Sequence, residues 1–266
     1  MTSDFSSALS YGQFENSIRE QMAFWFAPGK GLMALAFLAP KNSGNGNPVL
    51  VIPGYGVGDG AMSIFRNMLE RSGYRPNGWG AGMNEGFSLE DEKRLAAMTK
   101  DIHWATGKKV SLVGWSLGGI YARAIAQDVP TSVQQVITMG TPWKGLEHTS
   151  LARRLERDSG KSLRELMPPE VHDRLLGTRL RLKVPFASIY SRDDGVSDWE
   201  ACHVDVNFKQ RCQSIEVTGQ HFDMPYSTEV FDIVDQILQT DISQWAPYQG
   251  NQAPEKSLDT SESFRP

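Results

Sequence analysis

A serine between two glycines is the pattern in this sequence with the clearest chemical meaning. Gly114, Ser116 and Gly118 lie in GWSLG, between the apolar run KKVSLV and the helix-like segment GIYARAIAQD. At a sharp strand-to-helix turn, a serine projects its hydroxyl above the sheet edge, and flanking glycines permit the turn. We therefore predict that Ser116 is a nucleophile. The competing interpretation is a glycine-rich turn that contains a spectator serine.

A nucleophilic serine requires a base, and the base requires a third group that orients it. Among the five histidines, His221 follows the predicted strand QSIEVTG and therefore leaves the carboxyl end of a strand, where α/β sheets keep their reactive groups. We predict that His221 is the base. The other four occur in a helix, in a long insertion or in a segment without clear assignment, and we interpret them as surface or core residues: His103, His148, His172 and His203.

The acid that orients the histidine is expected after the preceding strand, VPFASIYS. That run is followed by RDDGVSD, which offers Asp193, Asp194 and Asp198. We favour Asp194 because it stands beside the glycine of the turn, and Asp193 remains the alternative. Aspartate before glycine is also ordinary turn chemistry, which is the structural interpretation of both residues.

Backbone N–H groups are expected to stabilise the oxyanion of an acyl-transfer reaction. One donor is the N–H of Leu117, directly after the nucleophile, and a second should come from the loop after the early strand VLVI. That loop contains PGYG, and we predict the N–H of Tyr55, with that of Gly56 as the alternative. Each well-aimed donor lowers the barrier by roughly 3 kcal/mol.

Neither a metal nor an organic cofactor is indicated. The two cysteines, Cys202 and Cys212, are too few for a zinc site or a disulfide scaffold, although a bridge between them is conceivable. The segment 56–61, GVGDGA, matches the GxGxxA form of a dinucleotide loop. This match is weak, because Glu85, the acidic residue expected at the end of a second strand, stands among glycines instead.

The elements that must position these residues form an alternating series from residue 48 onward. Apolar runs rich in valine and isoleucine alternate with predicted helices at 61–72, 89–106, 117–128 and 225–239. Such runs are typical of strands buried on both faces. The sequence therefore predicts an α/β fold with a mainly parallel central sheet and helices on both faces.

The domain organisation is expected to be simple. Residues 1–246 are predicted to form one domain, in which a helix-rich insertion at about 141–183 caps the carboxyl edge of the sheet. The polar, turn-rich segment 247–266 is predicted to be a disordered tail. An amphipathic helix is expected at 13–26, packed on the core or in weak contact with a membrane surface through its aromatic residues.

The order IPGYG, GWSLGG, RDDGV and GQHFDM resembles the α/β-hydrolase superfamily, in particular lipases and esterases whose oxyanion loop reads PG. The stretches GYRPNGWGAGMNEG and GTPWKG are also similar to these proteins, and the resemblance spans about residues 48–240. It implies an α/β-hydrolase fold with a small helical cap, carboxylic ester hydrolysis, and a nucleophile, base, acid and two oxyanion donors at Ser116, His221, Asp194, Tyr55 and Leu117.

The arginines of the predicted cap are a departure from these lipases and esterases, which often carry a more apolar lid. The four are Arg153, Arg154, Arg157 and Arg164.

Composition restricts the partners. The chain has 266 residues, with 27 lysines and arginines against 31 aspartates and glutamates, which gives a formal charge of −4. This balance argues against nucleic-acid binding, which requires concentrated positive charge. The longest apolar run, 32–39, is far below the roughly 20 residues of a membrane span. No basic residue precedes Arg19, so a secretory signal is not indicated and a cytoplasmic location is expected.

Together these patterns predict a serine hydrolase that cleaves small-molecule or lipid esters through an acyl-enzyme, without indicating an oligomeric state. An acyltransferase would use the same residues with an alcohol or thiol in place of water. An inactive member of the fold that binds an acyl ligand is the alternative of another class. A histidine base predicts that activity falls as the imidazole protonates, near pH ~6.5 for an unperturbed ring.

Overall fold

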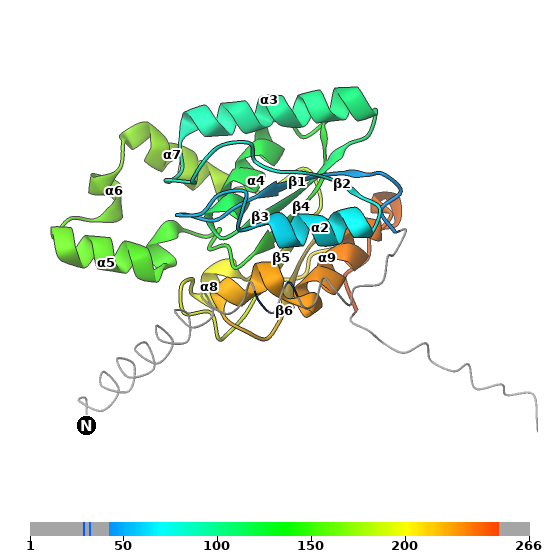
Figure 1. The fold of residues 1–266 in the computed structure, drawn as a ribbon. Helices are drawn as coiled ribbons and strands as arrows, with labels where there is room; N and C mark the ends of the chain where they lie inside the picture. The colour runs from blue at the N-terminus through cyan, green and yellow to red at the C-terminus, as the bar shows by residue number, and fades with distance from the viewer. Residues whose placement is uncertain (1–28, 30–31, 33–42, 250–266) are drawn as a thin grey trace, which may run out of the picture.

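Six parallel strands form one sheet at the centre of the protein (Figure 1). The structure, a computed structural model, describes residues 29, 32 and 43–249. The helix expected at 13–26 and residues 250–266 of the expected tail lie outside this range. The strand order is β2-β1-β3-β4-β5-β6, and every pair of neighbours is parallel. In chain order the strands are Pro48–Ile52, Arg75–Asn77, Val110–Trp115, Val133–Met139, Phe186–Tyr190 and Cys212–Glu216.

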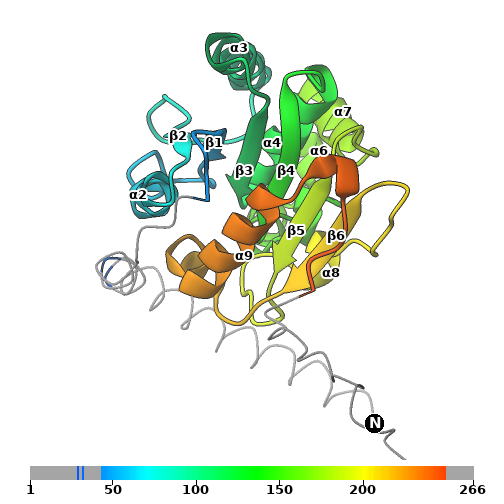
Figure 2. The ribbon, with the colours of Figure 1, turned by 90° about the vertical axis from the view of Figure 1, so that its right-hand side faces the viewer.

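Helices cover both faces of this sheet, as Figure 2 shows from the side. The helices α2 (Ser63–Arg71) and α9 (Thr228–Gln239) pack on one face, and α3 (Leu89–Thr106) and α4 (Leu117–Asp128) pack on the other. The expected α/β class, with a mainly parallel sheet between two helical layers, is therefore confirmed.

The strand β1 shows how the sequence produces these layers. All five of its residues are buried. Because side chains alternate along a strand, Val49 and Val51 pack with α2 and α9, whereas Leu50 and Ile52 pack with α3 and α4. A strand buried on both faces needs apolar residues at consecutive positions, which is why PVLVI shows no polar alternation.

The residues at both ends of α3 cap the helix, as the sequence indicates. The Ser88 side chain accepts a hydrogen bond from the N–H of Asp91, and Gly107 ends the helix in the left-handed conformation at φ 66°. The helix predicted at 225–239 instead begins at Thr228. Residues His221–Tyr226 form a 3-10 turn before it, and Ser227 provides its N-terminal cap.

Three short helices and a 3-10 turn lie between β4 and β5. They are η1 (Leu146–His148), α5 (Ser150–Ser159), α6 (Leu163–Leu166) and α7 (Pro169–Thr178). In Figure 1, α5, α6 and α7 lie together at one end of the molecule, and we call them the cap helices. Two further short elements are α8 (Trp199–Cys202) and η3 (Ile242–Gln244).

One arginine of α7 joins the cap helices to the body of the protein. The Arg174 guanidinium donates to Glu92 of α3 at 2.6 Å and to Asp128 of α4 at 2.9 Å. It also donates to the Gln127 side chain and to the Ala124 carbonyl oxygen. Burial raises the pKa of Glu92, and the hydrogen bond from Arg174 opposes that shift. Arg174 is therefore the counter-charge that stabilises the Glu92 carboxylate.

Arg174→Met is expected to lower the free energy of unfolding by about 2 kcal/mol, because it leaves a buried carboxylate unpaired in a network that is partly exposed. The double variant E92L/R174M removes both charges and is expected to recover part of the loss. Urea unfolding of the two variants and wild type measures both effects. A double variant less stable than R174M would contradict this role.

Candidate active site

Ser116 stands at the tight turn between β3 and α4. Its backbone has φ 55° and ψ −124°, a region that non-glycine residues rarely occupy. Gly114 and Gly118 are required by close packing, since a Cβ on Gly118 would collide with the Ile52 carbonyl oxygen and one on Gly114 with the backbone of Gly118. The two glycines therefore let the turn fit tightly against β1, with the serine at its apex.

His221 and Asp194 form a buried pair on two neighbouring loops. The His221 Nδ1 atom lies 2.7 Å from Asp194 Oδ2, and each side chain is only 2 % exposed. The second carboxylate oxygen, Oδ1, accepts the N–H groups of Val196 and Ser197 at 2.8 and 2.7 Å. Contacts on both oxygens thus fix the position of the carboxylate, which gives the imidazole one orientation.

The neighbouring aspartates have other contacts. Asp193 is exposed. Asp198 accepts a hydrogen bond from Arg153 of α5 at 2.7 Å, and it lies 3.8 Å from the His148 ring. Of the three aspartates after β5, Asp194 is the one whose carboxylate contacts His221.

The remaining histidines lie away from this pair. The ring of His103 contacts the Lys108 carbonyl oxygen at the end of α3, and His203 packs against Tyr190 and Trp199. His172 lines a separate cavity beneath the cap helices.

The loop after β1 lies directly against the serine. A Cβ built on Gly54 would lie 3.0 Å from the Ser116 Cβ atom. The N–H of Gly56 donates to the Asn84 carbonyl oxygen at 2.8 Å, whereas the N–H groups of Tyr55 and Leu117 have no acceptor within the described part of the chain. Of the two residues considered in this loop, Tyr55 therefore has the N–H that is available to a ligand.

Asn84 holds the loop around Tyr55 in place, and sequence reasoning did not select it. It is fully buried, and its side-chain amide donates to the Pro53 carbonyl oxygen at 2.9 Å. Its backbone N–H donates to the Val57 carbonyl oxygen, and its own carbonyl oxygen accepts from Gly56. These three bonds hold the loop on both sides of Tyr55. The only possible signal was a polar residue within a glycine-rich segment.

A cleft of about 540 Å³ lies beside Ser116. Ser116 and His221 both line it, together with Tyr55 and Leu117. Its other walls are largely apolar and come from the loops and the cap helices: Phe87, Leu146, Leu151, Leu155, Leu163 and Phe222. Arg154 of α5 also lines it. The cleft can therefore hold an apolar chain beside the serine.

Trp115, which also lines the cleft, contacts His221. Its ring lies 5.6 Å from the His221 ring between centroids, and its Nε1 donates to the His221 carbonyl oxygen at 3.2 Å. Phe222 packs edge-on against both rings. Trp115, the residue before Ser116, thus helps to hold His221 in place.

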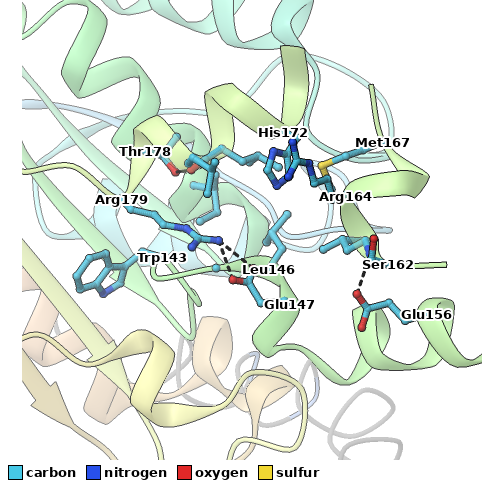
Figure 3. A pocket seen from close by; sticks show the side chains of 15 residues that line it. Trp143, Leu146, Glu147, Glu156, Ser162, Arg164, Met167, His172, Thr178 and Arg179 are labelled. Atoms are coloured by element: carbon cyan, nitrogen blue, oxygen red, sulfur yellow. Dashed lines mark hydrogen bonds and ion pairs between the residues drawn. The ribbon is translucent and has the colours of Figure 1, made fainter. Parts of the chain in front are cut away.

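A second cavity, of about 230 Å³, lies among the cap helices (Figure 3). Leu146 and Leu163 line both this cavity and the cleft. Figure 3 shows Arg179 reaching Glu147 inside it, and their side chains are 2.8 Å apart. Ser116 and His221 line the larger cleft and do not line this cavity.

The described residues provide no metal site and no competing thiol. No group of three or more His, Cys, Asp or Glu side chains could hold a metal ion in the described part of the chain. Cys202 and Cys212 are both unbridged. Burial raises the pKa of the Cys202 thiol well above its usual value, with the negative charge of Asp194 adding to the shift. This thiol is therefore neutral at physiological pH. Across the residues that the structure covers, no helix is long and apolar enough to cross a membrane.

Comparison with known proteins gives matches in structure. No protein-family profile and no curated sequence matches this chain. A Bacillus licheniformis lipase in its mature form is 18 % identical, with a TM-score of 0.52 over 72 % of this chain and 91 % of that one. A thermophilic carboxylesterase cloned from a metagenomic library is 16 % identical, with a TM-score of 0.51 over 79 % and 83 %.

A lipase-esterase related protein from Clostridium acetobutylicum is similar to a comparable degree. It is 15 % identical, with a TM-score of 0.51 over 75 % of this chain and 96 % of that one. These similarities, together with the all-parallel sheet, show that the chain has the α/β-hydrolase fold.

Proposed function

We propose that this protein is a serine hydrolase that cleaves carboxylic esters. The observation that carries the proposal is the buried pair of His221 and Asp194, whose histidine lines the same cleft as Ser116. The protein shares its fold with a lipase and a carboxylesterase, which adds support. A fold alone does not define a reaction, but it makes a reaction found on the same fold a better hypothesis.

In the proposed reaction, the Ser116 hydroxyl attacks the ester carbonyl carbon while His221 takes its proton. Asp194 accepts a hydrogen bond from the Nδ1–H of the imidazole, and the Nε2 lone pair is therefore free to act as the base. The carbonyl oxygen becomes an oxyanion, and the N–H groups of Tyr55 and Leu117 stabilise it. Collapse of the tetrahedral intermediate breaks the ester bond, and the imidazolium returns its proton to the leaving alcohol.

Water completes the cycle. His221 removes a proton from water, the resulting nucleophile attacks the acyl-serine, and the second tetrahedral intermediate releases a carboxylic acid and restores the serine hydroxyl. The low exposure of the His221 and Asp194 side chains favours these proton transfers, because the imidazolium and the carboxylate attract each other more strongly away from solvent. The substrate class that suits the walls of the cleft is an ester with an apolar acyl chain.

Covalent labelling tests the proposal directly. A fluorophosphonate probe is expected to label wild type and to leave Ser116→Ala unlabelled, with peptide mass spectrometry assigning the label to residue 116. Wild type is also expected to release p-nitrophenol from p-nitrophenyl butyrate. A folded protein that neither reacts with the probe nor hydrolyses the ester would contradict the proposal and would favour an inactive member that binds acyl ligands.

The apolar wall formed by the cap helices predicts a dependence on chain length. Leu155→Asp places a charge on the cleft wall, and it is expected to lower kcat/KM for p-nitrophenyl octanoate about tenfold while changing the acetate ester little. Leu166→Asp is the matched control, because Leu166 is an exposed cap residue that does not line the cleft. Equal losses on both esters would argue against an acyl chain at Leu155.

A further inference from the structure

A third cavity, of about 130 Å³, carries an unusual distribution of charge. Arg123, Arg179 and Arg181 line it, and no aspartate or glutamate does. The remaining walls are mostly apolar, and they come from the loop after β4 and from the segments around β5 and β6: Trp143, Leu182, Val184, Phe186, Val204, Gln210 and Cys212. In a chain with a formal charge of −4, a cavity lined by three arginines and no carboxylate is a local concentration of positive charge.

Arg123 is the buried member of this group. It lies on α4, and it is only 2 % exposed. Its Nε donates to the Thr178 carbonyl oxygen and its Nη2 to the Leu180 carbonyl oxygen, both at 2.9 Å. A guanidinium has five N–H donors, and no acceptor contacts Nη1 within the described residues.

The surroundings of Arg123 do not neutralise its charge. The guanidinium carbon lies 4.6 Å from the ring centroid of Trp143 and 4.5 Å from that of Phe186, so the group is held between two aromatic rings. Such rings attract a cation but offer no oxygen acceptor. Burial lowers the pKa of Arg123 to about 9, and the group therefore remains charged at neutral pH. A buried cation without a counter-ion is costly.

The other two arginines of the cavity make different contacts. Arg179 is paired with Glu147 on the side of the neighbouring cavity, as Figure 3 shows. Arg181 is exposed, and its Nη2 contacts the Lys209 carbonyl oxygen at 3.2 Å. Neither arginine brings a carboxylate to Arg123. Among the described residues, Arg123 therefore donates to backbone carbonyl oxygens and has no carboxylate partner.

We propose that this cavity binds a small carboxylate with a short apolar tail, whose oxygens accept the N–H groups of Arg123 that contact no acceptor among the described residues. The planar carboxylate matches the fork of donors on a guanidinium. The aromatic and aliphatic walls suit a short hydrocarbon tail rather than a fully hydrated anion such as phosphate. The volume is below the roughly 300–1,000 Å³ of sites for drug-sized ligands, which restricts the ligand to a few carbon atoms.

Isothermal titration calorimetry with sodium butyrate, at an ionic strength held constant with sodium chloride, tests the site. Wild type is expected to bind in a saturable manner, and Arg123→Met to lose this binding. Arg181→Gln is expected to weaken it about three- to fivefold, as for a partly exposed charge contact. Arg157→Gln, an exposed residue outside the cavity lining, removes the same charge and is expected to bind as wild type does.

Three results would overturn the proposal. The first is the absence of saturable binding to wild type, and the second is inorganic phosphate binding as tightly as butyrate. The third is equal binding by R181Q and R157Q, which would place butyrate elsewhere, for instance in the catalytic cleft. If R123M fails to fold by circular dichroism, the comparison of R181Q with R157Q decides the question. The site does not depend on the proposed hydrolase function.

Discussion

Ser116→Ala is expected to lower kcat for p-nitrophenyl butyrate by about four to six orders of magnitude, because the acyl-enzyme route requires the hydroxyl. A small residual rate is expected, since the cleft and the N–H groups of Tyr55 and Leu117 remain. Alanine keeps the Cβ atom, so the unusual backbone conformation at φ 55° is under the same constraint as in wild type. The midpoint of thermal unfolding should therefore change little.

The control for this prediction is another serine of the same cleft. Ser150 lines the cleft from the start of α5, and no role in the reaction is proposed for it. Ser150→Ala should retain most of the wild-type activity. A loss in S150A as large as that in S116A, or an active S116A free of wild-type contamination, would show that the reaction does not proceed through Ser116.

The elements that sequence reasoning located well are those with strong local signals. The helix predicted at 89–106 has the same bounds in the structure, because Ser88 and Gly107 act as its caps. The helix predicted at 117–128 also matches, because the non-helical backbone conformation of Ser116 ends just before it. In contrast, β2 was not predicted. It consists of Arg75, Pro76 and Asn77 at the edge of the sheet, and none of them is a strand-forming apolar residue.

For the candidate site, the sequence was informative about residues whose type suits the reaction and which follow the end of a predicted strand. His221 and Asp194 were selected because each follows the carboxyl end of a predicted strand, and parallel strands bring those ends to one edge. Asn84 and Arg123 could not be selected in this way. Their importance depends on partners far away along the chain, Pro53 and the Thr178–Leu180 backbone, which only tertiary packing brings near.

A second large loss of activity is expected when Asp194 is substituted, and it distinguishes Asp194 from Asp193. Asp194→Asn keeps the size of the side chain, and its remaining oxygen can still accept the N–H groups of Val196 and Ser197. The new amide group would face His221 Nδ1 as a donor, and it would favour the tautomer whose Nε2 carries a proton and cannot act as a base. We expect kcat to fall about 10⁴-fold, the scale of this change in a Ser-His-Asp triad.

Asp193→Asn is the matched control, with the same substitution at the adjacent residue. Its side chain is exposed, and its contact with the rest of the turn is a backbone one, from its N–H to the Ser191 hydroxyl. Removing this carboxylate should change kcat by less than about threefold, the scale of a single screened surface charge. Steady-state kinetics on both variants, with circular dichroism to verify folding, decides between the two residues. A large loss in D193N with an active D194N would mean that the buried contact to His221 is not the one that orients the base.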